Sequence, residues 1–159
     1  MKKIALVVVL MAAVVCFCSA AGAQESSGLK GKTGFGYTNA GTPLGLKMWV
    51  SDGMALDASV GFNTAAGVQN FGIQLGADFV MSNKYPVVLQ FRPALGFDVG
   101  ATTNLSVPIM LNIEYFVTKN LSLSAGSGAL IFWQLSPASA FTFSHCVNTT
   151  SSLGVIYYF

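Results

Sequence analysis

The chain has 159 residues, of which 53% are hydrophobic and only 9% are charged. Its formal net charge of +2 includes Lys2 and Lys3, which lie in a leader that we expect to be removed. The remaining six cations and six acids give a neutral protein, which argues against nucleic acid as a partner because phosphate binding needs an excess of basic residues. A charged fraction far below the usual quarter is also atypical of a soluble domain.

The first 23 residues predict a cleavable signal peptide. Lys2 and Lys3 precede an almost unbroken apolar run over residues 4–17, and the small residues 21–23 follow at the positions that signal peptidase reads. This run is too short for a membrane anchor. We expect cleavage after Ala23, so that residues 24–159 form one exported domain. Only Cys146 then remains of the three cysteines, which leaves no intramolecular disulfide.

Beyond the leader, apolar residues alternate with small or polar ones, which is the period of a β-strand. Leu44, Leu46 and Met48 fall on one face of such a segment, and Gly45 and Lys47 fall on the other. The same pattern recurs along the chain. In order, the expected strands are residues 30–37, 44–50, 54–63, 71–81, 87–99, 105–117, 121–131 and 151–159.

The connections between these strands fall into two alternating sets. Turn-forming residues predict tight turns at 51–53, 82–86 and 118–120. The other set consists of short loops, except for the interruption at 132–148, which we expect to be the longest loop. An even number of antiparallel strands with tight turns on one side is typical of bacterial membrane barrels.

The composition of the two faces separates a membrane barrel from a soluble sandwich or lipocalin-like barrel. One face of each strand is almost purely aliphatic and aromatic, and in water such a belt would be an aggregation hazard. No apolar run after the leader approaches the ~20 residues of a membrane helix. We therefore predict an all-β fold, an eight-stranded antiparallel up-and-down transmembrane β-barrel.

The small and polar faces then line the lumen and carry four cations and four acids. The hairpin at 51–53 places Lys47 opposite Asp57, and the following turns bring Asp78, Arg92 and Glu114 into the same band. We predict a balanced charge network that fills the interior as a plug, with a gate that breaks and re-pairs as the alternative. The charges on the lumenal faces are Lys30, Lys32, Lys47, Arg92, Asp57, Asp78, Asp98 and Glu114. The predicted network consists of Lys47, Asp57, Asp78, Arg92, Asp98 and Glu114.

Few residues suggest chemistry. His145 is the only histidine, and Ser144 and Cys146 flank it. A hydrolase would need a nucleophile, this base and a carboxylate together, and Asp98 is the acid that we expect nearest to it. A single His with a single Cys is too few ligands for a metal site. We expect no metal and no cofactor.

The closing stretch of residues 151–159 places Leu153, Val155, Tyr157 and Phe159 on one face. Together with the leader and the eight alternating segments, it makes the chain resemble the small bacterial outer-membrane barrels, the OmpA transmembrane-domain and OmpX-like class. The resemblance implies a location in the outer membrane of a Gram-negative cell, with lipid around a monomer. It also implies that the barrel assembly machinery reads Tyr157 and Phe159.

The same resemblance implies a structural, envelope-integrity role without enzymatic activity. Two alternatives stay open at this point. One is a narrow passive, porin-like channel through the lumen. The other is an outer-membrane lipid-modifying enzyme that uses His145.

Overall fold

The computed structural model describes residues 28–65, 68–136, 140–146 and 152–159. None of these residues belongs to a helix long and apolar enough to cross a membrane. They form nine strands: β1 (Thr33–Tyr37), β2 (Leu44–Ser51), β3 (Met54–Ala65), β4 (Val68–Lys84), β5 (Val87–Val99), β6 (Thr103–Phe116), β7 (Leu121–Ser136), β8 (Ala140–Cys146) and β9 (Ser152–Tyr158).

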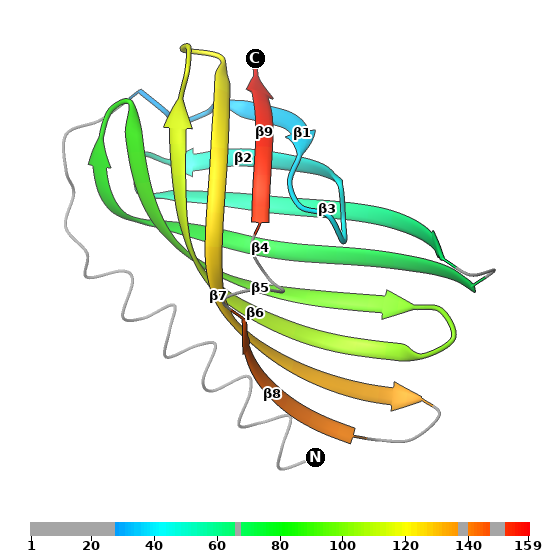
Figure 1. Cartoon of the computed structure of the whole chain (residues 1–159). Coiled ribbons are helices and arrows are strands. Elements are labelled where there is room, and N and C mark those ends of the chain that lie inside the picture. The colour runs from blue at the N-terminus through cyan, green and yellow to red at the C-terminus, as the bar shows by residue number, and fades with distance from the viewer. Residues whose placement is uncertain (1–27, 66–67, 137–139, 147–151) are drawn as a thin grey trace.

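The strands close into an eight-stranded antiparallel up-and-down barrel (Figure 1). Each strand from β1 to β7 pairs with its successor in sequence. β9 completes the ring, because it pairs with the start of β7 on one side and with β1 on the other. β8 pairs with the far part of β7, so β8 and β9 occupy successive stretches of the eighth position. The predicted all-β class and strand number are confirmed.

Two predicted loops are wrong in extent. β7 continues to Ser136 and β8 returns beside it, so most of the loop expected at 132–148 is a strand pair. The loop expected at 64–70 shrinks likewise, because β3 reaches Ala65 and β4 starts at Val68. Both stretches contain β-branched or aromatic residues, which favour strands. Pairing with a neighbouring strand therefore keeps the backbone extended, although the polar residues among them favour a loop. The paired strands β3 to β8 therefore extend well beyond the short β1 and β2 (Figure 1).

Side chains alternate between an exposed apolar face and a buried face of small or polar residues. In β2, Leu44, Leu46 and Met48 are exposed, whereas Lys47 and Trp49 are buried. We call the exposed apolar face the outer belt. It consists of Phe35, Tyr37, Leu44, Leu46, Met48, Leu56, Val60, Phe62, Ile73, Leu75, Leu95, Phe97, Leu111, Ile113, Tyr115, Leu123, Leu135, Leu153, Val155, Tyr157 and Phe159.

The tight-turn end of the barrel, which carries the turns after β2, β4 and β6, is filled by apolar side chains. Leu29 is 0% exposed and belongs to this cluster, although it precedes the first strand. We call this cluster of buried apolar residues the seal. Its members are Leu29, Trp49, Ala55, Val88, Phe116, Ile156 and Tyr158.

Backbone hydrogen bonds hold Leu29 in the seal. The Oδ1 atom of Asp52 accepts from the backbone N–H of Leu29 at 3.0 Å and from that of Lys30 at 3.1 Å. Gly31 N donates to the carbonyl of Trp49 at 2.8 Å, with its φ angle at +84°. Glycine adopts this left-handed conformation without strain, which lets the chain fold across the barrel end before β1 begins.

Leu29→Ala should lower the free energy of unfolding by about 2 to 5 kcal/mol, because it removes a fully buried side chain and leaves a cavity. Urea titration of the protein folded in a neutral detergent measures this. Leu46→Ala, on the outer belt, is the matched control and should cost clearly less, since it opens no internal void. Equal losses would mean that Leu29 is not packed in the seal.

Candidate functional site in the barrel interior

Five charged side chains lie inside the barrel, on the faces that alternate with the outer belt. All are at most 8% exposed, and each comes from one of strands β2 to β6. Burying charges is costly unless each one is paired and hydrogen-bonded, so the contacts of this group decide what it does. We call the group the ionic layer; it consists of Lys47, Asp57, Asp78, Arg92 and Glu114.

The ammonium of Lys47 lies at the centre of the first half of this layer. Its Nζ atom is 2.9 Å from Asp78 Oδ2 and 2.8 Å from Glu114 Oε2. It also donates to Gln90 Oε1 at 3.0 Å, so all three of its donors have partners. The Nζ atom lies 5.1 Å from the centre of the ring of Trp49, a member of the seal. The ammonium is thus fully coordinated by protein groups.

Glu114 is 0% exposed and accepts four hydrogen bonds. Its Oε1 atom accepts from the Ser122 hydroxyl at 2.6 Å and from the Tyr158 hydroxyl at 2.7 Å. Its Oε2 atom accepts from Lys47 and, at 2.9 Å, from Gln90 Nε2. Both oxygens are satisfied, which is the condition under which a buried carboxylate is tolerated.

Arg92 and Asp57 form the second half of the ionic layer. The guanidinium contacts both carboxylate oxygens of Asp57, through Nε at 3.0 Å and through Nη2. Nη2 also donates to Gln74 Oε1 at 2.9 Å. The pair passes directly over Gly76, where a Cβ atom would lie only 2.5 Å from Asp57 Oδ2 and 2.9 Å from Arg92 Nη2. Gly76 therefore provides the space for this bidentate pair.

The strand register places Lys47 opposite Asp57, as the hairpin predicts. The ion pairs nevertheless run elsewhere: Lys47 reaches Asp78 and Glu114, and Asp57 takes Arg92. Long side chains reach diagonal neighbours inside a narrow barrel, and the fully hydrogen-bonded arrangement prevails over the directly opposite one.

Of the eight charges predicted on the lumenal faces, five form the ionic layer, two of them cations and three carboxylates. Lys30 is exposed, and Lys32 donates to the carbonyl of Lys119 at 2.8 Å at the tight-turn end. Both lysines precede β1, and their long aliphatic side chains carry the ammonium groups towards solvent. Asp98 lies on the same face of β5 as Arg92 but outside the layer, and none of the described side chains forms an ion pair or hydrogen bond with it.

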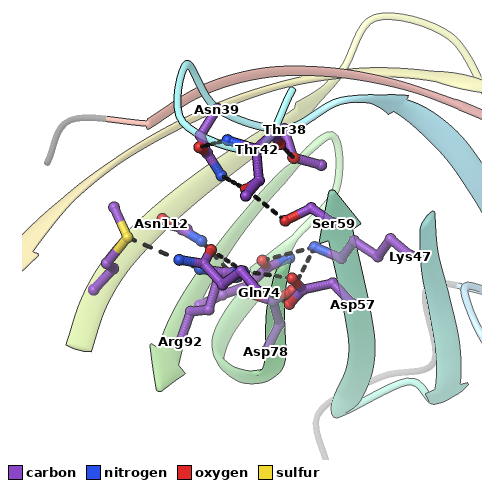
Figure 2. Close-up of polar contacts among 12 residues, drawn as sticks. Thr38, Asn39, Thr42, Lys47, Asp57, Ser59, Gln74, Asp78, Arg92 and Asn112 are labelled. Carbon is purple, nitrogen blue, oxygen red and sulfur yellow. Dashed lines mark hydrogen bonds and ion pairs between the residues drawn. The ribbon is translucent and has the colours of Figure 1, made fainter. Parts of the chain in front are cut away.

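A cavity of about 300 Å³ lies against the ionic layer, and Ile156 of the seal also lines it. Arg92, Asp57 and Asp78 border it, together with Asp98 and the β1–β2 connection. That connection folds inward: the Thr42 hydroxyl lies 2.7 Å from the Ser59 hydroxyl, and Figure 2 shows Thr38, Asn39 and Thr42 above the charged side chains. The other uncharged polar residues of the lining are Gln74, Gln90, Asn112, Ser106, Ser124 and Ser152.

The strand register does not bring Ser144, His145 and Asp98 together. The register places Asp98 opposite Asn104 and at the level of Ala140 on β8, three strands away from β5. His145 lies five residues further along β8, opposite Ala129. Three strand spacings amount to ~14 Å and five residues to ~17 Å, which is too far for a hydrogen-bonded triad. The side chains of β8 lie outside the described residues.

Sequence reasoning missed Ser122, Tyr158 and Gln74 as partners of the charged groups. All three lie on inward positions that the period of two already identifies, and Tyr158 alternates with the outward Tyr157 and Phe159. Their hydroxyl and amide groups would have been found by asking which inward polar groups share a level with a buried charge.

Comparison of the chain with protein-family models, with curated proteins and with solved structures found no match.

Glu114→Gln should destabilise the protein by about 3 kcal/mol, because it leaves Lys47 with one carboxylate fewer and puts an amide group beside it. Asp98→Asn makes the same chemical change at an acid without a partner and should change stability by less than about 0.5 kcal/mol. Urea unfolding of both variants provides the comparison. A large loss for Asp98→Asn with none for Glu114→Gln would contradict the described pairing.

Gly76→Ala should also destabilise, by about 2 kcal/mol, since the added methyl group displaces the Arg92–Asp57 pair. Gly53→Ala is the control, because a Cβ atom there meets nothing closer than 3.9 Å. Thermal unfolding followed by circular dichroism distinguishes the two. A Gly76→Ala protein as stable as the wild type would show that the pair does not occupy this space.

Proposed function

We propose that this protein is an integral outer-membrane β-barrel with a structural, envelope-integrity role and no enzymatic activity. Residues 1–23 are its cleaved signal peptide in this proposal, and residues 24–159 are the barrel domain. The single observation that carries the proposal is the outer belt. It surrounds a closed barrel whose interior holds the five charged side chains of the ionic layer.

This distribution is the reverse of what a water-soluble barrel needs. In water, the outer belt would form a contiguous apolar surface far larger than monomers tolerate. In a bilayer, outward apolar and inward polar residues are the expected alternation. The closed ring also pairs the backbone groups of its strands with one another, as hydrocarbon requires.

The last strand supports the proposed route of insertion. Tyr157 and Phe159 are 54% and 72% exposed, with ring centres 6.3 Å apart. They extend the outer belt to the tight-turn end of the barrel, beside the start of β1. We propose that the barrel assembly machinery reads this exposed aromatic pair, and that the protein then resides in lipid as a monomer.

The interior supports a structural role over the two alternatives. A channel needs a continuous water path, and both the seal and the fully hydrogen-bonded Glu114 weigh against one. A lipid-modifying enzyme that uses His145 needs a carboxylate nearby, and the register distance to Asp98 weighs against it. An ionic layer that links five strands instead favours rigidity of the wall.

Heat-modifiability of the protein from isolated outer membranes tests the proposal. A closed membrane barrel resists SDS until it is boiled and then shifts its gel mobility. We expect a shift, with the protein in the outer-membrane fraction. A soluble periplasmic protein without a shift would overturn the proposal and indicate a soluble barrel instead.

Leu75→Arg should lower the stability of the lipid-inserted barrel by about 2 to 4 kcal/mol, since it places a charge on the lipid face. Ala101→Arg adds the same side chain at an exposed position between β5 and β6 and should be nearly neutral. Urea titration in phosphocholine vesicles measures both. Equal stability of the two variants would place Leu75 in water rather than in lipid.

A further inference from the structure

We propose that the cavity beside the ionic layer is a binding site for a small organic cation that carries an ammonium group. The inference goes beyond the structural role and does not rest on it, because every group involved lies inside the barrel wall. Three observations carry the inference: a cavity with one closed end, an excess of negative charge around it, and hydrogen-bonding groups without partners on its lining.

The cavity is closed at one end and reaches the surface at the other. The ionic layer and the seal fill the barrel on the tight-turn side. On the opposite side, the lining includes the exposed Ala40 and Gly41 and the half-buried Asp98. With about 300 Å³, it has the volume of the smallest ligand pockets. A small molecule therefore enters from the long-strand side and stops at the ionic layer.

The charges around the cavity do not cancel. Its lining holds two cations and three acids, namely Lys47, Arg92, Asp57, Asp78 and Asp98. The lining thus carries one more acid than cations. Low-dielectric walls strengthen the resulting potential and concentrate ions of the opposite sign. A cation is the occupant that this field favours.

Asp98 is the acid that a ligand would meet first. Its Oδ1 atom lies over Gly72, where a Cβ atom would be 2.5 Å away from it and 3.3 Å from the methyl group of Thr42. The ion pairs of the ionic layer occupy Lys47 and Arg92, and no described side chain pairs with Asp98. A half-buried carboxylate without a partner is stabilised by any ammonium that reaches it.

One further group on the lining has unused hydrogen-bonding capacity, although it is about nine-tenths buried. The Oδ1 atom of Asn112 has no hydrogen-bond partner. Figure 2 shows this side chain near Gln74 and Arg92, which also line the cavity. Buried polar groups normally find partners, and an acceptor oxygen without one suits a ligand that donates hydrogen bonds, as an ammonium does.

An organic cation fits this lining better than a metal ion does. The described residues contain no group of three or more His, Cys, Asp or Glu side chains that could hold a metal. An ammonium group needs only one carboxylate and a few amide or hydroxyl oxygens, and Asp98, Gln74 and Ser106 supply these on the lining.

Isothermal titration calorimetry of the folded protein in a neutral detergent tests the proposal. The probe is 1,4-diaminobutane, with 1,4-butanediol as its neutral counterpart and NaCl to keep the ionic strength constant. The wild type should bind the diamine and not the diol. Asp98→Asn should weaken binding at least tenfold. Asp52→Asn, which removes the same charge at the tight-turn end, should bind like the wild type.

The outcomes separate the proposal from its alternatives. No heat from the diamine, or equal heats from diamine and diol, would overturn the cation site and leave a water-filled cavity. If Asp98→Asn and Asp52→Asn bind the diamine with equal affinity, net charge alone explains the binding, and the assignment of the site to Asp98 is overturned. Gel mobility before and after boiling first checks that each variant is folded. If Asp98→Asn does not fold, the comparison of diamine with diol on the wild type still tests whether the cavity binds a cation.

Discussion

The buried contacts around Lys47 and Glu114 are the interaction on which the rest of the structure depends. A charged pair in a closed interior is stable only while every donor and acceptor is satisfied. Here the partners come from β2, β4, β5, β6, β7 and β9, so one cluster connects six of the nine strands. A slip of one residue in any of these strands would turn its charged or polar group outward. The cluster thus fixes the register of these six strands.

The outer belt and the interior are two consequences of the same alternation. Each strand offers one face to its surroundings and one to the lumen, and the charged residues of the strands are concentrated on the second. Inward glycines such as Gly76 leave room for the long charged side chains of neighbouring strands. The apolar seal then separates this polar interior from the tight-turn end. The result is a barrel that is apolar outside, closed at one end and hollow towards the other.

The sequence predicted the features that depend on period and turn chemistry. The eight strand positions, the faces of β2 and the register of Lys47 against Asp57 all follow from alternation and a short hairpin. It did not predict which buried charges pair, because diagonal contacts between long side chains depend on the radius and tilt of the barrel. Asp98 was therefore grouped with charges that it does not contact.

Leu29 and β8 were missed for different physical reasons. Leu29 lies in a polar lead-in without periodicity, and its burial arises only once the chain folds back over the barrel end. The residues of β8 are ordinary for a strand, but Ser136, Pro137 and Ser139 before it indicate a loop in the sequence. Pairing with the extended end of β7 decides the conformation there, and that pairing is a tertiary effect.

The measurement that tests the central claim most directly is the accessibility of spin labels on the barrel reconstituted in phosphocholine vesicles. Cys146 is replaced by serine, and single cysteines for labelling are placed at Leu46, Leu75 and Ser124. We expect the labels at Leu46 and Leu75 to collide readily with oxygen, which dissolves in lipid, and rarely with a water-soluble nickel chelate. The label at Ser124 should meet little oxygen. Ready collision of the Leu46 and Leu75 labels with the chelate would place the outer belt in water and contradict a membrane barrel.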